Sequence, residues 1–416
     1  MKPSYSAPKK CLPKIRYNQN LSIDGSDIIT WTSGKGNAGD IGLYVEETLF
    51  IGGDNPSRNE GSRVYSSPFS SSNGGNGGSI LVEAKDILIM DGSYISGTAF
   101  GPGNGADITV RATGTILLTG VNDEGYTSGI FANSNPLKKL GAKNAGDIDV
   151  EASKLIIEKG AMISSSTLAR DGRQSGKGGN ITVHVSGEIS LTGVNLYGEN
   201  EEGLGSGIFV YSRSVGGQAN DAGNILIEAG SLSITEGASI SSGTDSSAQG
   251  GNIIVHINDS LKISGDSAKI KLSTAPAAKS SQSEFQEQFP NPRISISGIY
   301  ANSSELSNDA GNAGNLDIQA PSINLTEDGT INTSTQNSGG GHIILTTQEQ
   351  IYLYKSQITT SVKGGKEAGG NITIKNPIFV VLNESQIKAQ AYEGHGGRVL
   401  TRSLFKQYFS CYFCVS

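Results

Sequence analysis

Residues 222–253 read AGNILIEAGSLSITEGASISSGTDSSAQGGNI, which is one complete period of a repeat that fills most of this chain of 416 residues. The period opens on the Gly-rich tetrapeptide 222–225, and 250–253 opens the next one. The signature recurs along the chain, and neighbouring copies lie 27–29 residues apart where nothing is inserted. Its first apolar residues, called anchors below, are Ile41, Ile80, Ile108, Ile148, Ile181, Ile225, Ile253, Leu316, Ile343, Ile372 and Val399.

Alternation of apolar and polar residues within the period predicts short β-strands. Apolar residues alternate with polar ones at 225–227, at 232–234 and again around Ile240, and period-two spacing places every other side chain on one face. Helical spacing is absent, and the gaps hold Gly, Ser, Asn and Thr, which favour turns. The chain is therefore predicted to be all-β, with three short strands per period.

The spacing of these strands predicts a solenoid. The second strand starts 7 or 8 residues after the anchor in alternating turns, and the 7-residue class includes the pair Ile372 and Phe379. In that class an isoleucine follows 15 residues after the anchor, at Ile95, Ile163, Ile240, Ile331 and Ile387. We predict a right-handed parallel β-helix of about ten three-strand turns of ~27 residues with loop insertions, because a propeller blade needs four strands in ~40–50 residues.

The repeat also bounds the domain organisation. It predicts one elongated domain over residues 21–400, between an irregular segment 1–20 and a non-repeat tail 401–416. In the first turn Leu21, Ile23 and Ile29 have the spacing of Leu232, Ile234 and Ile240, whereas the first strand near Lys14 matches poorly. Because the pattern breaks inside a turn at both ends, we expect a fragment of a longer protein.

Composition argues against several classes of partner and cofactor. The formal net charge is −7 and no run of Lys or Arg exceeds a pair, which argues against nucleic acid and anionic lipid. No stretch is apolar enough for a membrane span, and no signal peptide is visible at the N-terminus. Cys411 and Cys414 have the spacing of a redox or metal pair, but we interpret them as two thiols in the tail and expect no cofactor or metal.

The polar residue before each anchor is expected to stack on its counterpart one turn away. Asparagine stacked on asparagine forms a side-chain amide ladder, and this predicts a structural ladder of Asn180, Asn224, Asn252 and Asn315. The same position holds Asp40, Asp107 and Asp147, and stacked carboxylates are expected to repel, so the ladder is predicted for the four asparagines only.

Insertions between the second and third strands are the candidate binding region. They recur in the 8-residue turns at 119–129, 192–207 and 264–298, and at 52–63 in the first of these turns, so they are expected to project from one side of the rod. Repeat proteins often bind through such loops. The candidate ligand-binding residues are Asp123, Glu124, Tyr126, Tyr197, Glu199, Glu201 and Glu202.

A catalytic function is the alternative. Right-handed β-helices host polysaccharide lyases and hydrolases, which need paired carboxylates, or acids that hold calcium beside a Lys or Arg. Asp40, Asp107 and Asp147 are candidates, but they recur at the register position of the repeat, which favours a role in turn formation. His184 and His256 share an offset from their anchors and suggest equivalent surface positions. We expect no enzyme, with a carbohydrate-active β-helix as the alternative.

The sequence pattern of the repeats resembles that of a known family. The Gly-Gly-Asn-Ile and Ala-Gly-Asp-Ile signatures, the Ser-Gly-Ile segments at 128–130, 206–208 and 297–299, and the stretch 236–242 resemble the repeats of filamentous-haemagglutinin-like exoproteins of the large cyanobacterial type. The resemblance spans roughly residues 21–400 and covers the repeat region only, because the N-terminal secretion domain of the family has no counterpart here.

The resemblance implies a function and a location. Members of the family are exported by two-partner secretion through an outer-membrane β-barrel transporter, and their β-helix folds at the cell surface. It therefore implies a non-catalytic, adhesin-like stalk, part of a larger exoprotein that is extracellular or attached to the cell outer membrane. The implied ligand is a carbohydrate or protein at the surface of a host or neighbouring cell.

Overall fold

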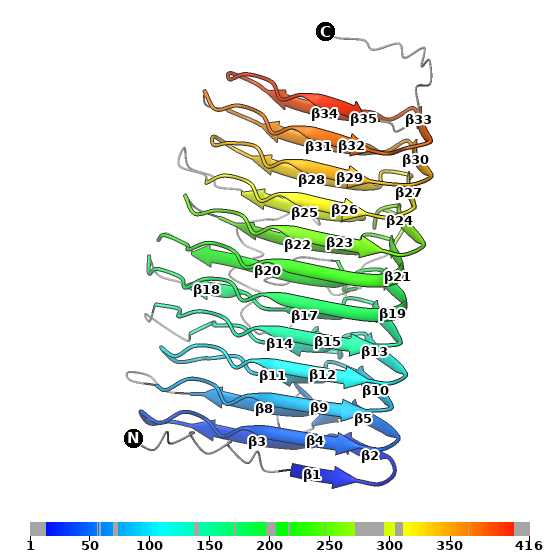
Figure 1. The fold of residues 1–416 in the computed structure, drawn as a ribbon. Helices are drawn as coiled ribbons and strands as arrows, with labels where there is room; N and C mark the ends of the chain where they lie inside the picture. Colours follow the sequence, from blue (N-terminus) through cyan, green and yellow to red (C-terminus); the bar gives the residue numbers. More distant parts are fainter. Residues whose placement is uncertain are drawn as a thin grey trace, which may run out of the picture.

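The fold is described from a computed structural model. It describes residues 14–402 except 56, 58–59, 70–73, 137–140, 170–171, 197–204, 215–216, 246, 271–294, 304–310 and 365. In Figure 1 the turns lie one above another from the N-terminal end to the C-terminal end, and each turn runs once around the rod. The chain is a parallel β-helix, as the period predicts.

Each turn contributes strands to three parallel ladders, which lie in two large sheets. The first strands of the turns are β1 (Lys14–Tyr17), β4 (Ile41–Val45), β9 (Ile80–Ala84), β12 (Ile108–Ala112), β15 (Ile148–Ala152), β19 (Ile181–Thr192), β21 (Ile225–Thr235), β23 (Ile253–Ile257), β26 (Leu316–Gln319), β29 (Ile343–Thr346), β32 (Ile372–Lys375) and β35 (Val399–Arg402). β19 and β21 run on through the corner and also supply the second strand of their turns.

The other two ladders follow the same order along the rod. Separate second strands are β2 (Leu21–Asp24), β5 (Thr48–Gly52), β10 (Asp86–Met90), β13 (Thr115–Thr119), β16 (Lys154–Glu158), β24 (Ser260–Ser264), β27 (Ser322–Thr326), β30 (Gln350–Tyr354) and β33 (Phe379–Asn383). The third strands are β3 (Asp27–Thr32), β8 (Arg63–Pro68), β11 (Tyr94–Ser96), β14 (Gly129–Phe131), β17 (Met162–Ser164), β20 (Gly207–Ser214), β22 (Ser239–Thr244), β25 (Gly298–Ser303), β28 (Thr330–Thr335), β31 (Gln357–Val362) and β34 (Gln386–Ala391). β18 (Thr167–Ala169) extends the third ladder, and β6 (Asp54–Asn55) and β7 (Glu60–Gly61) form a small antiparallel hairpin.

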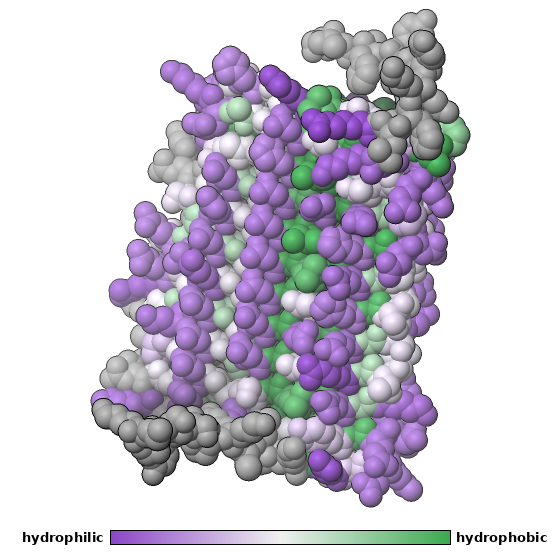
Figure 2. Space-filling model, in the orientation of Figure 1, coloured by the Kyte–Doolittle hydropathy of each residue, from purple (hydrophilic) through white to green (hydrophobic). Residues whose placement is uncertain are grey.

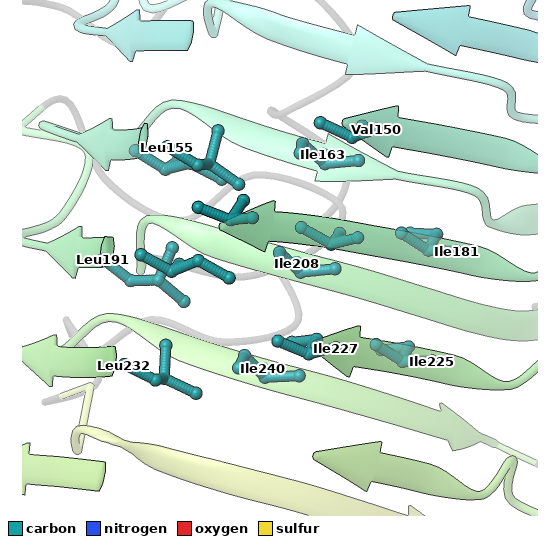
Figure 3. Close-up of a cluster of buried hydrophobic side chains, with 14 of the residues drawn as sticks. Val150, Leu155, Ile163, Ile181, Leu191, Ile208, Ile225, Ile227, Leu232 and Ile240 are labelled. Atoms are coloured by element: carbon teal, nitrogen blue, oxygen red, sulfur yellow. The ribbon is translucent and has the colours of Figure 1, made fainter. Parts of the chain in front are cut away.

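Inward-facing aliphatic side chains stack in columns and form the core. On the third strands Ile208, Ile240 and Ile299 are in register on consecutive turns and are fully buried. Figure 3 shows Ile163, Ile208 and Ile240 in one such column, with the first-strand residues Ile181 and Ile225 in another. Burial of each isoleucine contributes about 1.5–3 kcal/mol, but only because the neighbouring turns cover it.

The corner between the second and third strands needs a left-handed backbone. Gly92, Gly160 and Gly237 have φ between +72° and +86° there, as do the glycines that open the insertions. Residues with side chains share this conformation in the same corner all along the rod, from Asp91 at φ +56° to Glu384 at φ +50°.

Two predicted registers are wrong by one residue. Ile28, and not Ile29, aligns with Val64 and so with the isoleucine column, and Ile29 is 40% exposed. The corner from β2 to β3 contains only residues 25–26, whereas the corner from β21 to β22 contains 236–238. Likewise Val380, and not Phe379, aligns with Ile351. A change of one residue in a corner turns the alternate side chains to the other face.

The predicted N-terminal boundary is also corrected. Residues 14–17, assigned above to an irregular segment, form β1 and pair in parallel with β4. The repeat therefore begins at least seven residues before position 21. At the other end β35 reaches Arg402, and residues 1–13 and 403–416 lie outside the described part.

The surface carries the periodicity of the interior. Figure 2 shows hydrophilic residues in columns along the rod, on either side of a hydrophobic stripe.

Within the described residues no helix is long and apolar enough to cross a membrane.

Candidate functional site

The residue before each anchor forms a hydrogen-bonded column, called here the first polar column. Asn224 Oδ1 accepts the backbone N–H of Asn252 at 3.0 Å and the side-chain N–H of the same residue at 3.3 Å. Asn180 accepts from Asn224 in the same way, and Asn252 from Asn315. The four asparagines singled out from the sequence thus lie in one ladder, with a main-chain bond in every step.

The ladder extends to the aspartates, which corrects the expectation that they would repel. Asp107 Oδ1 accepts the backbone N–H of Asp147 at 2.9 Å, and Asp147 Oδ1 accepts from Asn180 at 2.7 Å. Asp40 accepts from Ser79. A carboxylate accepts a main-chain N–H as readily as an amide does. The donor is the backbone of the next turn, so two stacked carboxylates need not face one another.

A second polar column, three residues before the first, was not anticipated. Asn37 Oδ1 accepts the backbone N–H of Asn76 at 2.9 Å, Asn76 accepts from Asn104 at 3.0 Å, and Asn104 accepts from Asn144 at 3.2 Å. The sequence signal is the spacing Asn-x-x-Asp or Asn-x-x-Asn, present at 37–40, 104–107, 144–147 and 312–315. Where both columns hold asparagine or aspartate, the corner before the first strand is therefore clamped at two points, as Asn144 and Asp147 clamp Lys177 and Asn180.

Glycine between the two columns allows the turns to approach. A Cβ built on Gly223 would lie 2.1 Å from the carbonyl oxygen of Gly179, and one on Gly251 would lie 1.8 Å from that of Gly223. Real Cβ atoms do not approach so closely, which explains the glycine of the repeated signature. The result is a shallow polar groove of about 300 Å³ lined by residues 177–178, 180, 221–224 and 249–252.

The insertions leave the rod at one corner and share one kind of base. They begin at Gly120, Gly193 and Gly265, all with φ near +80°. At the return of each insertion a serine donates its backbone N–H to that glycine's carbonyl: Ser128 at 3.1 Å, Ser206 at 2.9 Å and Ser297 at 3.0 Å. Because this bond joins the two ends of each insertion, a long loop at the corner has little effect on the stacking of the turns.

The same serines connect each insertion to the preceding turn. Their hydroxyl oxygens are fully buried and accept the backbone N–H of Gly92, Gly160 and Gly237 at 2.8–2.9 Å. Each insertion is thus fixed at its neck by a main-chain bond within its turn and a hydroxyl bond to the turn before.

Three of the predicted ligand-binding residues lie on one tight loop. Asn122 organises it, because its Oδ1 accepts the backbone N–H of Glu124 at 3.2 Å and of Tyr126 at 2.9 Å. Asp123 is exposed, and Glu124 and Tyr126 are half-buried. The other predicted residues, Tyr197, Glu199, Glu201 and Glu202, lie outside the described residues.

The bases of successive insertions are linked, either directly or through the turn between them. Asn122, only 4% exposed, donates from Nδ2 to Asp54 Oδ1 of the preceding insertion at 3.3 Å. Val194 and Ser267, from the next two insertions, both lie against Gly237 of the turn between them. We call the corner that carries the insertions 53–62, 120–128, 193–206 and 265–297 the insertion edge. Its sequence signal, missed above, is the repeated Thr-Gly-Val-Asn at 119–122 and 192–195.

Aromatic rings lie over glycines beside the insertion edge. Phe131, Phe209 and Tyr300 each follow a third-strand glycine by two residues, and the ring atom Cζ lies 2.6–3.0 Å from the site of a Cβ on that glycine. Tyr300 also donates its hydroxyl to the Ile296 carbonyl at 2.9 Å. The Ser-Gly-Ile segments of the sequence therefore combine a neck serine, a glycine under a ring and a core isoleucine.

An ion-pair cluster fixes the first insertion. Arg63 bonds Asp27 of the turn before at 3.0 and 3.2 Å, and Glu60 of the hairpin at 2.8 Å. Burial lowers the pKa of Arg63, but the hydrogen bond to Asp27 and the nearby charges more than offset it, so the pKa is raised. Burial also raises the pKa of Tyr94, which lies on the next turn in register with Arg63.

The outward face of the first strands carries a column of charges. Arg111 lies 3.1 Å from Glu151, 3.4 Å from Asp149 and 3.7 Å from Glu83. Further along, His184 Nδ1 lies 2.9 Å from Glu228 and His256 Nδ1 lies 3.6 Å from it, and all three are roughly half-exposed. In the described part of the chain no three His, Cys, Asp or Glu residues lie close enough to hold a metal ion.

Comparison with known proteins finds no match: no family model matches the chain, and neither the curated proteins nor the solved structures include a similar one.

Proposed function

We propose that this chain is a non-catalytic, adhesin-like stalk whose insertion edge carries the ligand-binding loops. The observation that carries the proposal is the contrast between two corners of the same rod. The corner of the two polar columns repeats the same clamp in turn after turn. The corner of the insertions keeps a common neck but varies in length and sequence.

The hydrogen bonds of the candidate catalytic acids also support a role as scaffold. Asp40, Asp107 and Asp147 are the acids that an enzyme reading of the sequence would use, and each accepts a main-chain hydrogen bond from the next turn. One oxygen of each carboxylate therefore accepts a hydrogen bond that holds two turns together. The same use in successive turns favours register formation over chemistry at one position.

The location and partners of the proposed stalk follow from the resemblance of the repeats. We propose that this chain belongs to a larger exoprotein, which is secreted or presented at the cell surface through an outer-membrane β-barrel transporter. Its ligand is a carbohydrate or protein on a host or neighbouring cell. A rod of stacked turns suits this role, because it displays several loops in one row at a distance from its base.

The chain itself offers the variant that tests the proposal. Asp91–Ser93 connects β10 to β11 by a tight corner, so the same three residue types can replace 53–62, 120–128, 193–206 and 265–297. The serine of the short corner preserves the hydroxyl of the neck serine. We expect a folded rod with unchanged β-type circular dichroism that has lost binding to cells and to arrayed glycans and matrix proteins.

The control is Tyr352→Ala, which changes an outward side chain on β30 away from the insertion edge. It should bind as the parent chain does. Unchanged binding by the short-corner variant would contradict the proposal. Release of reducing ends or unsaturated sugars from polysaccharides would instead support the carbohydrate-active alternative.

A further inference from the structure

A pocket opens on a different edge of the rod, at the corner between the first and second strands near the N-terminal end. It has a volume of about 380 Å³, within the range of small-molecule sites. Its walls come from β1, β4 and β9 and from the corners that follow them. The lining side chains used below are Arg16, Tyr44, Glu46, Glu83 and Lys85.

The pocket exists because successive corners differ in length. Residues 46–47 connect β4 to β5, and 113–114 connect β12 to β13, but Lys85 alone connects β9 to β10. The shortest corner thus lies between two longer ones, and the pocket is lined by Glu46, Lys85 and Thr113 from these three corners. The corners are held by main-chain bonds, such as Glu46 N to the Tyr17 carbonyl at 3.0 Å, so the recess is a fixed part of the fold.

The pocket also interrupts the column of charges on the first-strand face. Arg16, Tyr44, Glu83 and Arg111 are in register on consecutive turns. Where the column elsewhere pairs acid with base, Tyr44 presents a ring, and the Arg16 guanidinium lies 5.5 Å from its centre. Glu83 lies 3.7 Å from Arg111, longer than a hydrogen bond.

The chemistry of the lining selects one class of ligand. Two bases, Arg16 and Lys85, offset two acids, Glu46 and Glu83, so the lining has no formal net charge and does not favour an ion. Lys85 Nζ also lies 2.8 Å from Glu47 Oε2 beside the pocket, which leaves its other N–H groups for a ligand. Carboxylates accept hydrogen bonds from hydroxyls, and cationic groups donate to them. An aromatic ring presents a flat apolar face. A molecule with an apolar face and a rim of hydroxyl groups satisfies all of these groups together.

We propose that this pocket binds one uncharged sugar residue of a saccharide, with an apolar face of the sugar against Tyr44 and its hydroxyls on Glu46, Glu83, Arg16 and Lys85. The site is separate from the insertion edge, so the proposal does not depend on the ligand or function of the insertions.

The test uses the full chain and saturation-transfer NMR with defined probes. The probes are the methyl β-glycosides of glucose, galactose and N-acetylglucosamine, with glucuronate as the charged comparison. We expect at least one neutral glycoside to bind with a Kd of about 10 mM or tighter, with saturation strongest at its ring C–H protons. Tyr44→Ala should weaken binding at least about tenfold, and Tyr44→Phe should retain it because the ring remains.

The control variant is again Tyr352→Ala, an outward tyrosine on β30, which should bind as the parent chain does. Unchanged circular dichroism and Tm of Tyr44→Ala exclude loss of fold as the cause of weaker binding. The proposal is overturned if no neutral glycoside binds, if only glucuronate binds, or if Tyr44→Ala binds as the parent does. Loss of cell binding in the short-corner variant, with glycoside binding intact, would separate this site from the insertion edge.

Discussion

Asn224 holds Asn252 by two bonds from one oxygen, a 3.0 Å bond to the backbone N–H and a 3.3 Å bond to the side-chain amide. The backbone bond is the one that recurs at every step from Asp107 to Arg398, including the steps made by aspartate and by His342. The column is therefore a main-chain clamp to which asparagine adds a second bond.

This distinction predicts different effects of two substitutions at Asn224. Asn224→Ala removes the acceptor of the Asn252 N–H and should lower the free energy of unfolding by about 1 kcal/mol. Asn224→Asp keeps the acceptor and should lose less than half of that. Denaturant unfolding measures the energies, and hydrogen exchange at the Asn252 amide reports the bond directly. Equal losses in the two variants would show that the amide-to-amide bond dominates.

Close stacking at the polar corner predicts that Gly251→Ala is severely destabilising. Its Cβ would lie 1.8 Å from the carbonyl oxygen of Gly223, so the turns must separate. We expect a loss of about 3 kcal/mol or more in the free energy of unfolding. Gly34→Ala is the matched control, because no heavy atom lies within 4 Å of a Cβ there. Similar Tm values for the two variants would contradict this account of the repeated glycine.

Core stacking predicts that substitution of an inward-facing isoleucine lowers the free energy of unfolding much more than substitution of an outward-facing one. Ile240 is fully buried between Ile208 and Ile299, and Ile240→Ala should lower the free energy of unfolding by about 2–5 kcal/mol. Ile254 is 38% exposed on the outward face, and Ile254→Ala should lower it by less than about 1 kcal/mol. Urea titration of the two variants compares them. A larger loss in Ile254→Ala would mean that another surface covers that face.

Buried tyrosines predict that the fold weakens at alkaline pH. Burial is the main cause of the raised pKa of both Tyr94 and Tyr300, whereas an unfolded tyrosine titrates near pH 10. Above about pH 10 the unfolded chain releases phenolic protons that the folded chain keeps, so stability falls as the pH rises towards the folded pKa. Below that pH these groups contribute no pH dependence.

Unfolding curves measured from pH 9 to pH 12 test this prediction, with absorbance at 295 nm to follow ionisation. Tyr94→Phe and Tyr300→Phe should each reduce the slope of stability against pH. Tyr392→Phe should leave it unchanged, because that side chain is 71% exposed. A slope insensitive to both buried substitutions would place the alkaline loss elsewhere.

Much of the fold could be predicted because its signals are local. Alternation along 225–227 and 232–234 places the same side chains inward whatever the neighbouring turn contains, and the Gly-rich signature marks each new turn. The four asparagines of the predicted ladder could be selected for the same reason, since a constant offset from the anchor brings equal positions together.

The errors occur at corners, where the neighbouring turns decide the geometry. Ile28 replaces Ile29 in the core column because the corner after Asp24 is one residue shorter than that after Thr235. The aspartates join the ladder because the donor is the backbone of the next turn, which residue type alone does not reveal.

The amino-acid sequence is enough to predict the class of fold, the three strands per turn, the identity of most core columns and the corner that carries the insertions. These follow from alternation and period, which act within a single turn. The second polar column, the rings over glycines, the contact of Asn122 with Asp54 and the pocket beside Tyr44 are found only in the folded chain. Each depends on which side chains and corner lengths meet across the distance between neighbouring strands, and stacking of the turns alone brings them together.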